Sequence, residues 1–283
     1  MERSTSRNGP LRFELRSAPI DIGPVLNERL YGKISSVIMT SATLSTGRRP
    51  NFQYFQNLSG LSACETKMLG SPFDYQRQVE LALIKGMPDP SDDLTSYTRL
   101  CAVVIRRYVK RFDGRTFVLF TSYKMLKDVA GLMKAWLNEH QYRLYSQADG
   151  MPRNRMLENF RAEPRGVLLG TDSFWQGVDV PGDALQCVII TRLPFSVPDH
   201  PLLQAQLEFI RQQGGEPFFD YQVPEAIIKL RQGFGRLVRS RDDKGTVVLI
   251  DPRVTTKSYG RLFVESLPGC TLVEDFAVGG DEE

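Results

Sequence analysis

The chain has 283 residues, of which 41% are hydrophobic and 24% are charged. This composition is ordinary for a globular protein with a sizeable core, and a formal net charge of only +3 at pH 7 gives no argument for nucleic-acid binding from overall charge. The sequence has no apolar run of 18 residues and no apolar signal core at its start, so we expect neither a membrane span nor a secretory leader.

The first third of the chain has few regular patterns. Residues 1–12 are polar, and we expect a flexible N-terminal edge there. A helix is expected over residues 22–31, and the apolar run 36–40 predicts a buried strand. A second strand is expected over residues 80–84, before a proline-containing loop.

From residue 95 onward, the sequence predicts a regular alternation of helices and strands. We expect helices over 95–111, 123–140, 151–161, 201–213 and 224–239. We expect strands over 116–120, 142–146, 166–169, 186–190 and 245–250. This alternation is typical of right-handed βαβ units, and the continuous apolar strands indicate a parallel α/β sheet with helices on both faces.

Several of the expected strands end in polar residues. They are Ser41/Thr43, Thr121/Ser122, Thr171/Asp172, Thr191/Arg192 and Asp251/Arg253. Because the carboxyl ends of parallel strands lie along one edge, we expect these side chains to gather there. That edge is where open α/β sheets bind their ligands.

The segment 170–182 follows one of these strands and is rich in small and acidic residues. In a functional interpretation, Asp179 accepts hydrogen bonds from a sugar hydroxyl, and Thr171 and Ser173 contact phosphates. Trp175 would then offer a stacking surface for a base.

The same segment also has a structural interpretation. Gly177 and Gly182 would serve turns, Asp172 and Asp179 would cap helices, and Trp175 would belong to the core. Ser122 and its neighbours could likewise cap the helix that follows them.

Gln232, Arg236 and Arg239 are spaced to share one face of the expected helix 224–239. Guanidinium groups suit phosphate binding, although a solvated basic helix end is the alternative. Gly233 and Gly235 each cost about 1 kcal/mol in a helix relative to alanine. We therefore expect another group to approach the backbone closely there.

Absent motifs narrow the chemistry. The sequence has no GxxxxGK[ST] phosphate loop, no strand-end Asp-Glu pair for Mg²⁺, no GxSxG and no HExxH. The cysteines show no CxxC spacing, and we expect reduced thiols and no metal site. A small-molecule α/β enzyme is the least favoured hypothesis, because no nucleophile–base pair is present. The cysteines are Cys64, Cys101, Cys187 and Cys270.

Four segments, in order, resemble motifs III, IV, V and VI of superfamily 2 helicases, and most closely the DinG branch of the XPD/DinG group. They are residues 40–44, 118–123, 170–182 and 232–239. The resemblance covers roughly residues 13–270. It implies a RecA-like fold of the P-loop NTPase type that lacks its own Walker A loop. It also implies a motor domain over 13–274 and an acidic tail over 275–283.

The resemblance implies the second motor domain of an ATP-dependent 5′→3′ DNA helicase. ATP and Mg²⁺ would bind jointly with a first motor domain that carries the Walker motifs. Arg236 and Arg239 would be arginine fingers on the ATP phosphates. Gln232 would contact the nucleotide, and Gln176 stands where many relatives carry glutamate.

The resemblance assigns the remaining site residues to three roles. On the nucleotide side it implies Gly177 and Asp179. On the nucleic-acid side it implies Ser122, Tyr123, Thr171, Ser173, Trp175 and Arg192. Ser41 and Thr43 would couple the two motor domains.

The implied partners are single-stranded or forked DNA and the first motor domain, which we expect in the same polypeptide. The implied location is the bacterial cytoplasm, at the nucleoid. An iron–sulfur cluster would belong only to the first half, and the isolated chain would have no ATPase activity. The alternative is a stand-alone nucleic-acid-binding or regulatory domain that keeps the fold without the motor.

Overall fold

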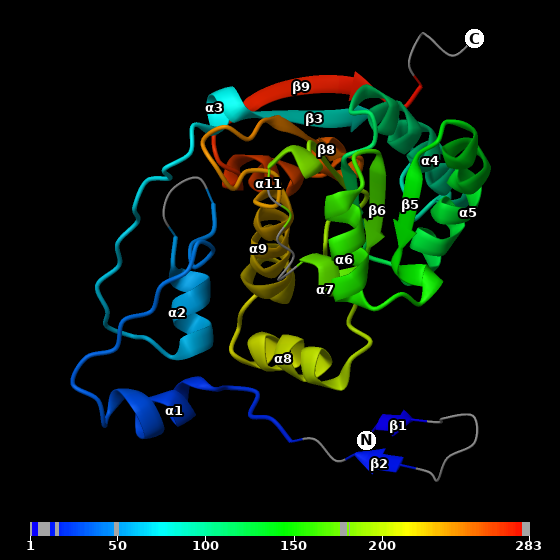
Figure 1. Ribbon diagram of the computed structural model, residues 1–283. Coiled ribbons are helices and arrows are strands. Elements are labelled where there is room, and N and C mark those ends of the chain that lie inside the picture. The colour runs from blue at the N-terminus through cyan, green and yellow to red at the C-terminus, as the bar shows by residue number, and fades with distance from the viewer. Residues whose placement is uncertain are drawn as a thin grey trace.

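A seven-stranded sheet forms the centre of the computed structural model, which describes residues 2–4, 12–14, 17–47, 51–175, 180 and 182–278 (Figure 1). The strand order is β5-β6-β4-β7-β8-β3-β9, and every neighbouring pair is parallel. This confirms the parallel α/β sheet predicted from the alternating pattern.

Six of the seven strands are those expected between residues 80 and 250. The seven are β3 (Val79–Lys85), β4 (Thr116–Leu119), β5 (Arg143–Ser146), β6 (Gly166–Gly170), β7 (Cys187–Ile190), β8 (Gly245–Leu249) and β9 (Thr271–Phe276). Strand β9 was not predicted, because it lies at the edge of the sheet with several side chains exposed and so lacks a continuous apolar run. It extends past residue 274, where we placed the domain boundary.

The strand expected over residues 36–40 is wrong. No strand occurs between residues 32 and 45, and Val37 and Ile38 are 39% and 85% exposed. An apolar run forms a buried strand only where a neighbouring strand supplies hydrogen bonds and cover. The described part of the chain places no such strand beside this segment.

The helices follow the predicted pattern, with shorter ones in the irregular regions. They are α1 (Gly23–Leu26), α2 (Gln53–Ser59), α3 (Tyr75–Gln78), α4 (Leu94–Arg111), α5 (Tyr123–Glu139), α6 (Arg153–Ala162), α7 (Asp172–Trp175), α8 (Pro201–Gln212), α9 (Val223–Phe234), α10 (Arg253–Thr256) and α11 (Gly260–Ser266). A π-helical turn, Asn27–Tyr31, continues α1, and another, Phe218–Gln222, leads into α9. Strands β1 (Glu2–Ser4) and β2 (Arg12–Glu14) form a separate antiparallel pair.

The core has two layers because successive strand residues face opposite sides of the sheet. Phe117 and Leu119 of β4 pack in the cluster that includes side chains of α6, α9 and α11. Val118 and Phe120 pack in the other cluster, with side chains of α4 and α5. The sheet is therefore covered by helices on both faces, as predicted.

Two smaller expectations can be compared with the structure. All four cysteines are free thiols, and Cys101 and Cys187 are buried. No helix in the described ranges is long and apolar enough to cross a membrane.

Candidate functional site

The carboxyl ends of four central strands form one row across the sheet. Gly170 of β6 pairs with Leu119 of β4, which pairs with Ile190 of β7, and Ile190 pairs with Leu249 of β8. The residues after this row therefore share one edge. This confirms the predicted gathering of polar strand ends, with the exception of Ser41 and Thr43, whose segment is not a strand.

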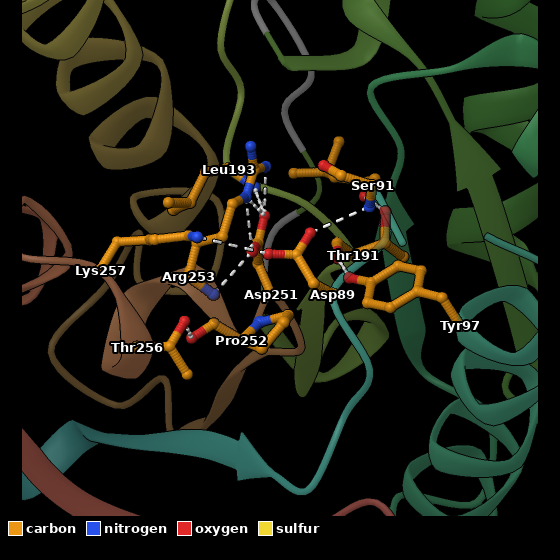
Figure 2. A network of polar contacts seen from close by, with 11 residues as sticks. Asp89, Ser91, Tyr97, Thr191, Leu193, Asp251, Pro252, Arg253, Thr256 and Lys257 are labelled. Carbon is orange, nitrogen blue, oxygen red and sulfur yellow. Dashed lines mark hydrogen bonds and ion pairs between the residues drawn. The ribbon is translucent and has the colours of Figure 1, made fainter. Parts of the chain in front are cut away.

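The ends of β7 and β8 form a closed polar network (Figure 2). Asp251 is almost fully buried, and its carboxylate accepts hydrogen bonds from the Leu193 amide at 2.7 Å and from Arg253 Nη2 at 2.6 Å. Arg253 donates again through Nε and its own amide. These bonds satisfy the buried charge within the protein.

Thr191 is part of the same closed region. Its hydroxyl donates to the Leu119 carbonyl at 2.9 Å, and its carbonyl accepts from the hydroxyl of Tyr97 on α4. Burial raises the pKa of Tyr97 well above its usual value. Arg192, the next residue, is half-buried beside this network.

The end of β6 is held by a residue that the sequence did not single out. Gln147 follows β5, and its Oε1 accepts hydrogen bonds from both the amide and the hydroxyl of Thr171 at 2.8 and 2.9 Å. Its Nε2 donates to the hydroxyl of Ser173 at 3.3 Å. Gln147 therefore orients the two hydroxyls that we expected on the phosphate side, while Ser173 remains exposed.

Trp175 does not present the stacking surface that we expected. It is 3% exposed, and its indole Nε1 donates to the Phe120 carbonyl at 3.2 Å. The structural interpretation of this residue is correct, because the ring fills the core between β4 and α9. Its aromatic face is therefore not available to a base in this structure.

The close approach predicted at Gly233 and Gly235 is confirmed at Gly233, whereas a Cβ on Gly235 would meet only carbonyl oxygens of the preceding turn. A Cβ on Gly233 would lie 2.9 Å from Cζ3 of Trp175 and 3.1 Å from a methyl group of Leu119. Only glycine leaves room for the indole at this position. The packing joins α9 to the segment that follows β6.

The shared helical face predicted for Gln232, Arg236 and Arg239 is wrong. Helix α9 ends at Phe234, and the Arg236 amide turns back to the Gly233 carbonyl at 3.1 Å. Two glycines near the helix end favour this early stop. Arg236 is buried, at 9% exposed, and its guanidinium donates to the Trp175 carbonyl.

Arg239 lies in the loop beyond α9 and is exposed. Its amide donates to Asp243 at 2.6 Å, and Asp243 also accepts from the Ser240 amide and hydroxyl. Burial opposes ionisation of Asp243, but these hydrogen bonds outweigh it and lower the carboxyl pKa. Gln78 braces the loop from below by donating to the Ser240 and Asp243 carbonyls.

Gln232 carries a buried acceptor. Its Oε1 atom is inaccessible to solvent and accepts no hydrogen bond from the described residues. A buried amide oxygen without a donor is costly unless a ligand or another group satisfies it. Because this atom is closed to solvent in this structure, it can contact a group outside the chain only after a neighbouring group moves.

Ser122 caps the start of α5, as its structural interpretation stated. Its hydroxyl accepts from the Met125 amide at 3.4 Å. The adjacent Tyr123 is 45% exposed. The positive end of the α5 dipole thus lies at the same sheet edge as Thr171.

The segment that contains Ser41 and Thr43 is attached to α9 by a residue that we had not predicted. Arg231 donates to the Ser45 carbonyl at 2.5 Å and to the Ala42 carbonyl at 3.3 Å. Burial lowers the pKa of its guanidinium. Ser41 and Thr43 hydrogen-bond one another and are not bonded to the sheet.

Gly177, Asp179 and Gln176 lie outside the described residues, so their predicted roles are not tested. Among the residues that are described, no group of three His, Cys, Asp or Glu side chains is placed to hold a metal ion.

Comparison with known proteins identifies the chain's relatives. The helicase C-terminal domain family matches residues 105–270. The ATP-dependent DNA helicase YoaA of Escherichia coli (strain K12) is 37% identical over 265 residues, which are 94% of this chain and 40% of that protein. The 3'-5' exonuclease DinG of Bacillus subtilis (strain 168) is 37% identical over 268 residues, covering 90% of this chain and 28% of that protein.

A solved XPD helicase structure superposes with a TM-score of 0.65 at 16% identity, covering 90% of this chain and 45% of that one. This likeness confirms the RecA-like fold class. The chain spans less than half the length of the curated relatives and of the XPD helicase described here.

Proposed function

The chain belongs to the helicase C-terminal domain family, and on that premise we propose that it is the second motor domain of an ATP-dependent 5′→3′ DNA helicase. A first motor domain with the Walker motifs would supply the other wall of the ATP cleft. ATP and Mg²⁺ would be held jointly by the two domains, in the bacterial cytoplasm.

The observation that carries this proposal is the contrast at the end of α9. Gln232 has a buried oxygen that accepts no hydrogen bond from the described residues, and Arg239 presents an exposed guanidinium seven residues later. An amide and a guanidinium suit the polar and phosphate groups of a nucleotide. Gly177 and Asp179 would contribute from the neighbouring segment.

The two arginines are proposed to differ in how they act. Arg239 would be the finger that reaches the ATP phosphates, because it is exposed and its loop is braced by Asp243. Arg236 is buried and donates to the Trp175 carbonyl, so it would position the adjoining loop as well as act as a finger. Trp175 would support the site from the core.

The DNA side is proposed to lie along the remaining strand ends. Thr171 and Ser173, oriented by Gln147, would contact the DNA backbone. The start of α5 at Ser122 and Tyr123 would add amide and aromatic contacts, with Arg192 nearby. The exposed segment that contains Ser41 and Thr43 would couple the two domains through its attachment to α9.

A reconstitution experiment tests the proposal. We expect no ATP hydrolysis from the 283-residue chain alone, and DNA-stimulated hydrolysis when the first motor domain is supplied. Arg239→Ala should reduce this turnover by about 10³–10⁵, the range for arginine fingers. Arg241→Ala, an exposed arginine in the same loop, is the matched control and should retain it.

Full turnover by Arg239→Ala would contradict the finger assignment. Because Arg236 is buried, Arg236→Lys is the better probe of that position than Arg236→Ala, and its thermal stability should be measured in parallel. If the first domain restores no turnover but the chain still binds single-stranded DNA in a salt-dependent manner, the stand-alone nucleic-acid-binding domain is the correct alternative.

A further inference from the structure

The outer face of α5 carries basic residues that the proposed function does not use. Lys124, Lys127 and Lys134 are exposed, whereas Met133 and Leu137 are among the residues that bury the opposite face of the helix. The basic face starts at the carboxyl edge of β4 and follows the helix away from it. It therefore continues from the residues at the start of α5 that we expect to contact DNA.

Two surface hollows border this face. One, of about 440 Å³, lies between α5 and β5 and is lined in part by Lys127, Lys134 and Arg143. The other, of about 500 Å³, lies between α4 and α5 and is lined in part by Lys124, Lys127 and Arg99. Lys127 and Gly131 line both, so the two hollows meet along α5.

Gly131 keeps this meeting point open. A Cβ at this position would have no atom within 4 Å, so the glycine is not required by packing. A glycine in the middle of a helix costs about 1 kcal/mol relative to alanine. The residue lowers the surface between the lysines instead of fitting a neighbour.

The charge in these hollows is mostly positive. Five basic side chains line them, against two acidic ones, Asp128 and Asp149. None of Lys124, Lys127 and Lys134 forms an ion pair within the described part of the chain. Lys127 instead lies with its Nζ 4.9 Å from the ring of Tyr123 at the start of the helix.

We propose that this α5 groove binds the phosphate backbone of a single DNA strand that extends beyond the strand-end contacts. The inference rests on the proposed function and lengthens its DNA-binding surface. Lys124 and Lys134 are ten residues apart, or about 15 Å along a helix. At the rise of about 3.4 Å per nucleotide of a B-form strand, that length accommodates four or five nucleotides.

The groove fits a single strand because cations and an aromatic ring occur together. Proteins that bind single strands combine a basic groove for the backbone with aromatic rings on which bases stack. Tyr123 is 45% exposed and lies next to Lys127. In a duplex, both faces of an interior base are covered by its stacked neighbours, so only an unstacked base of a single strand can lie against this ring.

Salt-dependent binding of a fluorescent oligo-dT to the 283-residue chain tests the groove. Lys127→Gln/Lys134→Gln should weaken binding on the order of tenfold at low salt and lower the salt slope by about 1.4. Lys110→Gln/Lys244→Gln removes the same charge from exposed lysines outside the groove. This control should change the affinity and the salt slope less than the groove variant does. Gly131→Glu should weaken binding more than Gly131→Gln, which separates charge from side-chain volume.

Equal affinities and salt slopes for the two double variants would contradict the proposal that the α5 groove binds DNA. If Ser173→Ala still weakens binding in that case, the proposed DNA contacts at the strand ends stand and only the groove is wrong. If the unaltered chain does not bind oligo-dT even at low salt, both the groove and the DNA contacts of the proposed function are wrong.

Discussion

At the ends of β7 and β8, polar side chains satisfy one another, whereas the region at the ends of β6 and α9 holds a buried acceptor and an exposed arginine. Asp251 and Arg253 are 1% and 16% exposed and share several hydrogen bonds. By contrast, Gln232 has a buried acceptor that the described residues leave unsatisfied, and Arg239 is exposed.

The difference separates two uses of one sheet edge. Every strand end there has polar residues, and residue type alone does not distinguish them. A buried and satisfied pair stabilises the fold, while an unsatisfied acceptor and an exposed guanidinium in one region suit a ligand. We therefore infer that the β7–β8 end is a scaffold and the β6–α9 corner is the site.

The largest effect on stability is expected at the scaffold. Asp251→Ala leaves Arg253 partly buried without its carboxylate, and loss of one partner from a buried pair costs about 3–5 kcal/mol. Urea unfolding measures this loss. Glu208→Ala, which breaks the exposed Arg211–Glu208 pair on α8, is the control and should cost about 0–1 kcal/mol. Similar costs for the two variants would contradict the scaffold assignment.

A pair of glycine substitutions sharpens the comparison at α9. Gly233→Ala should destabilise the chain by about 1–3 kcal/mol, because its Cβ meets Trp175 and Leu119. Gly131→Ala in α5 meets no atom within 4 Å and should stabilise by up to about 1 kcal/mol. The midpoint temperature of thermal unfolding should therefore fall in Gly233→Ala and rise in Gly131→Ala. A stabilising Gly233→Ala would show that Trp175 does not pack there.

The smallest effect concerns pH and the loop that presents Arg239. The folded-state pKa of Asp243 is lowered, so its stabilising effect is present above the unfolded pKa of about 4. That effect is lost as the pH falls through the folded pKa. Asp243→Asn should cost about 1–2 kcal/mol near neutral pH and less as the pH approaches 3. A difference from the unaltered chain that does not change with pH would contradict the role of the charge.

The sequence predicted the sheet and the edge at which its polar strand ends gather, because both follow from local patterns. Apolar runs such as 116–120 and 186–190 become buried parallel strands wherever helices cover both faces. The run 36–40 has the same apolar character but has no neighbouring strand among the described residues. Whether an apolar run forms a strand depends on the strands that lie beside it in the fold. The composition of the run itself does not specify those neighbours.

The candidate site was predicted by residue type but not by geometry. Spacing placed Arg236 and Arg239 on one helical face, whereas the chain turns after Phe234 and separates them. The roles of Gln147 and Arg231 could not be predicted, because both act through contacts with segments distant in sequence. Trp175 shows the same limit, since its burial depends on Gly233 of another element.

Measuring stability and turnover together in two arginine variants tests the division between scaffold and site most directly. With the first motor domain supplied, Arg239→Ala should keep the urea midpoint of the unaltered chain and lose DNA-stimulated ATP hydrolysis. Arg253→Ala should lower the midpoint, because it leaves Asp251 buried without its cation, and should retain hydrolysis at temperatures where it is folded. The reverse pattern, with an active Arg239→Ala and a stable but inactive Arg253→Ala, would contradict the assignment of both regions.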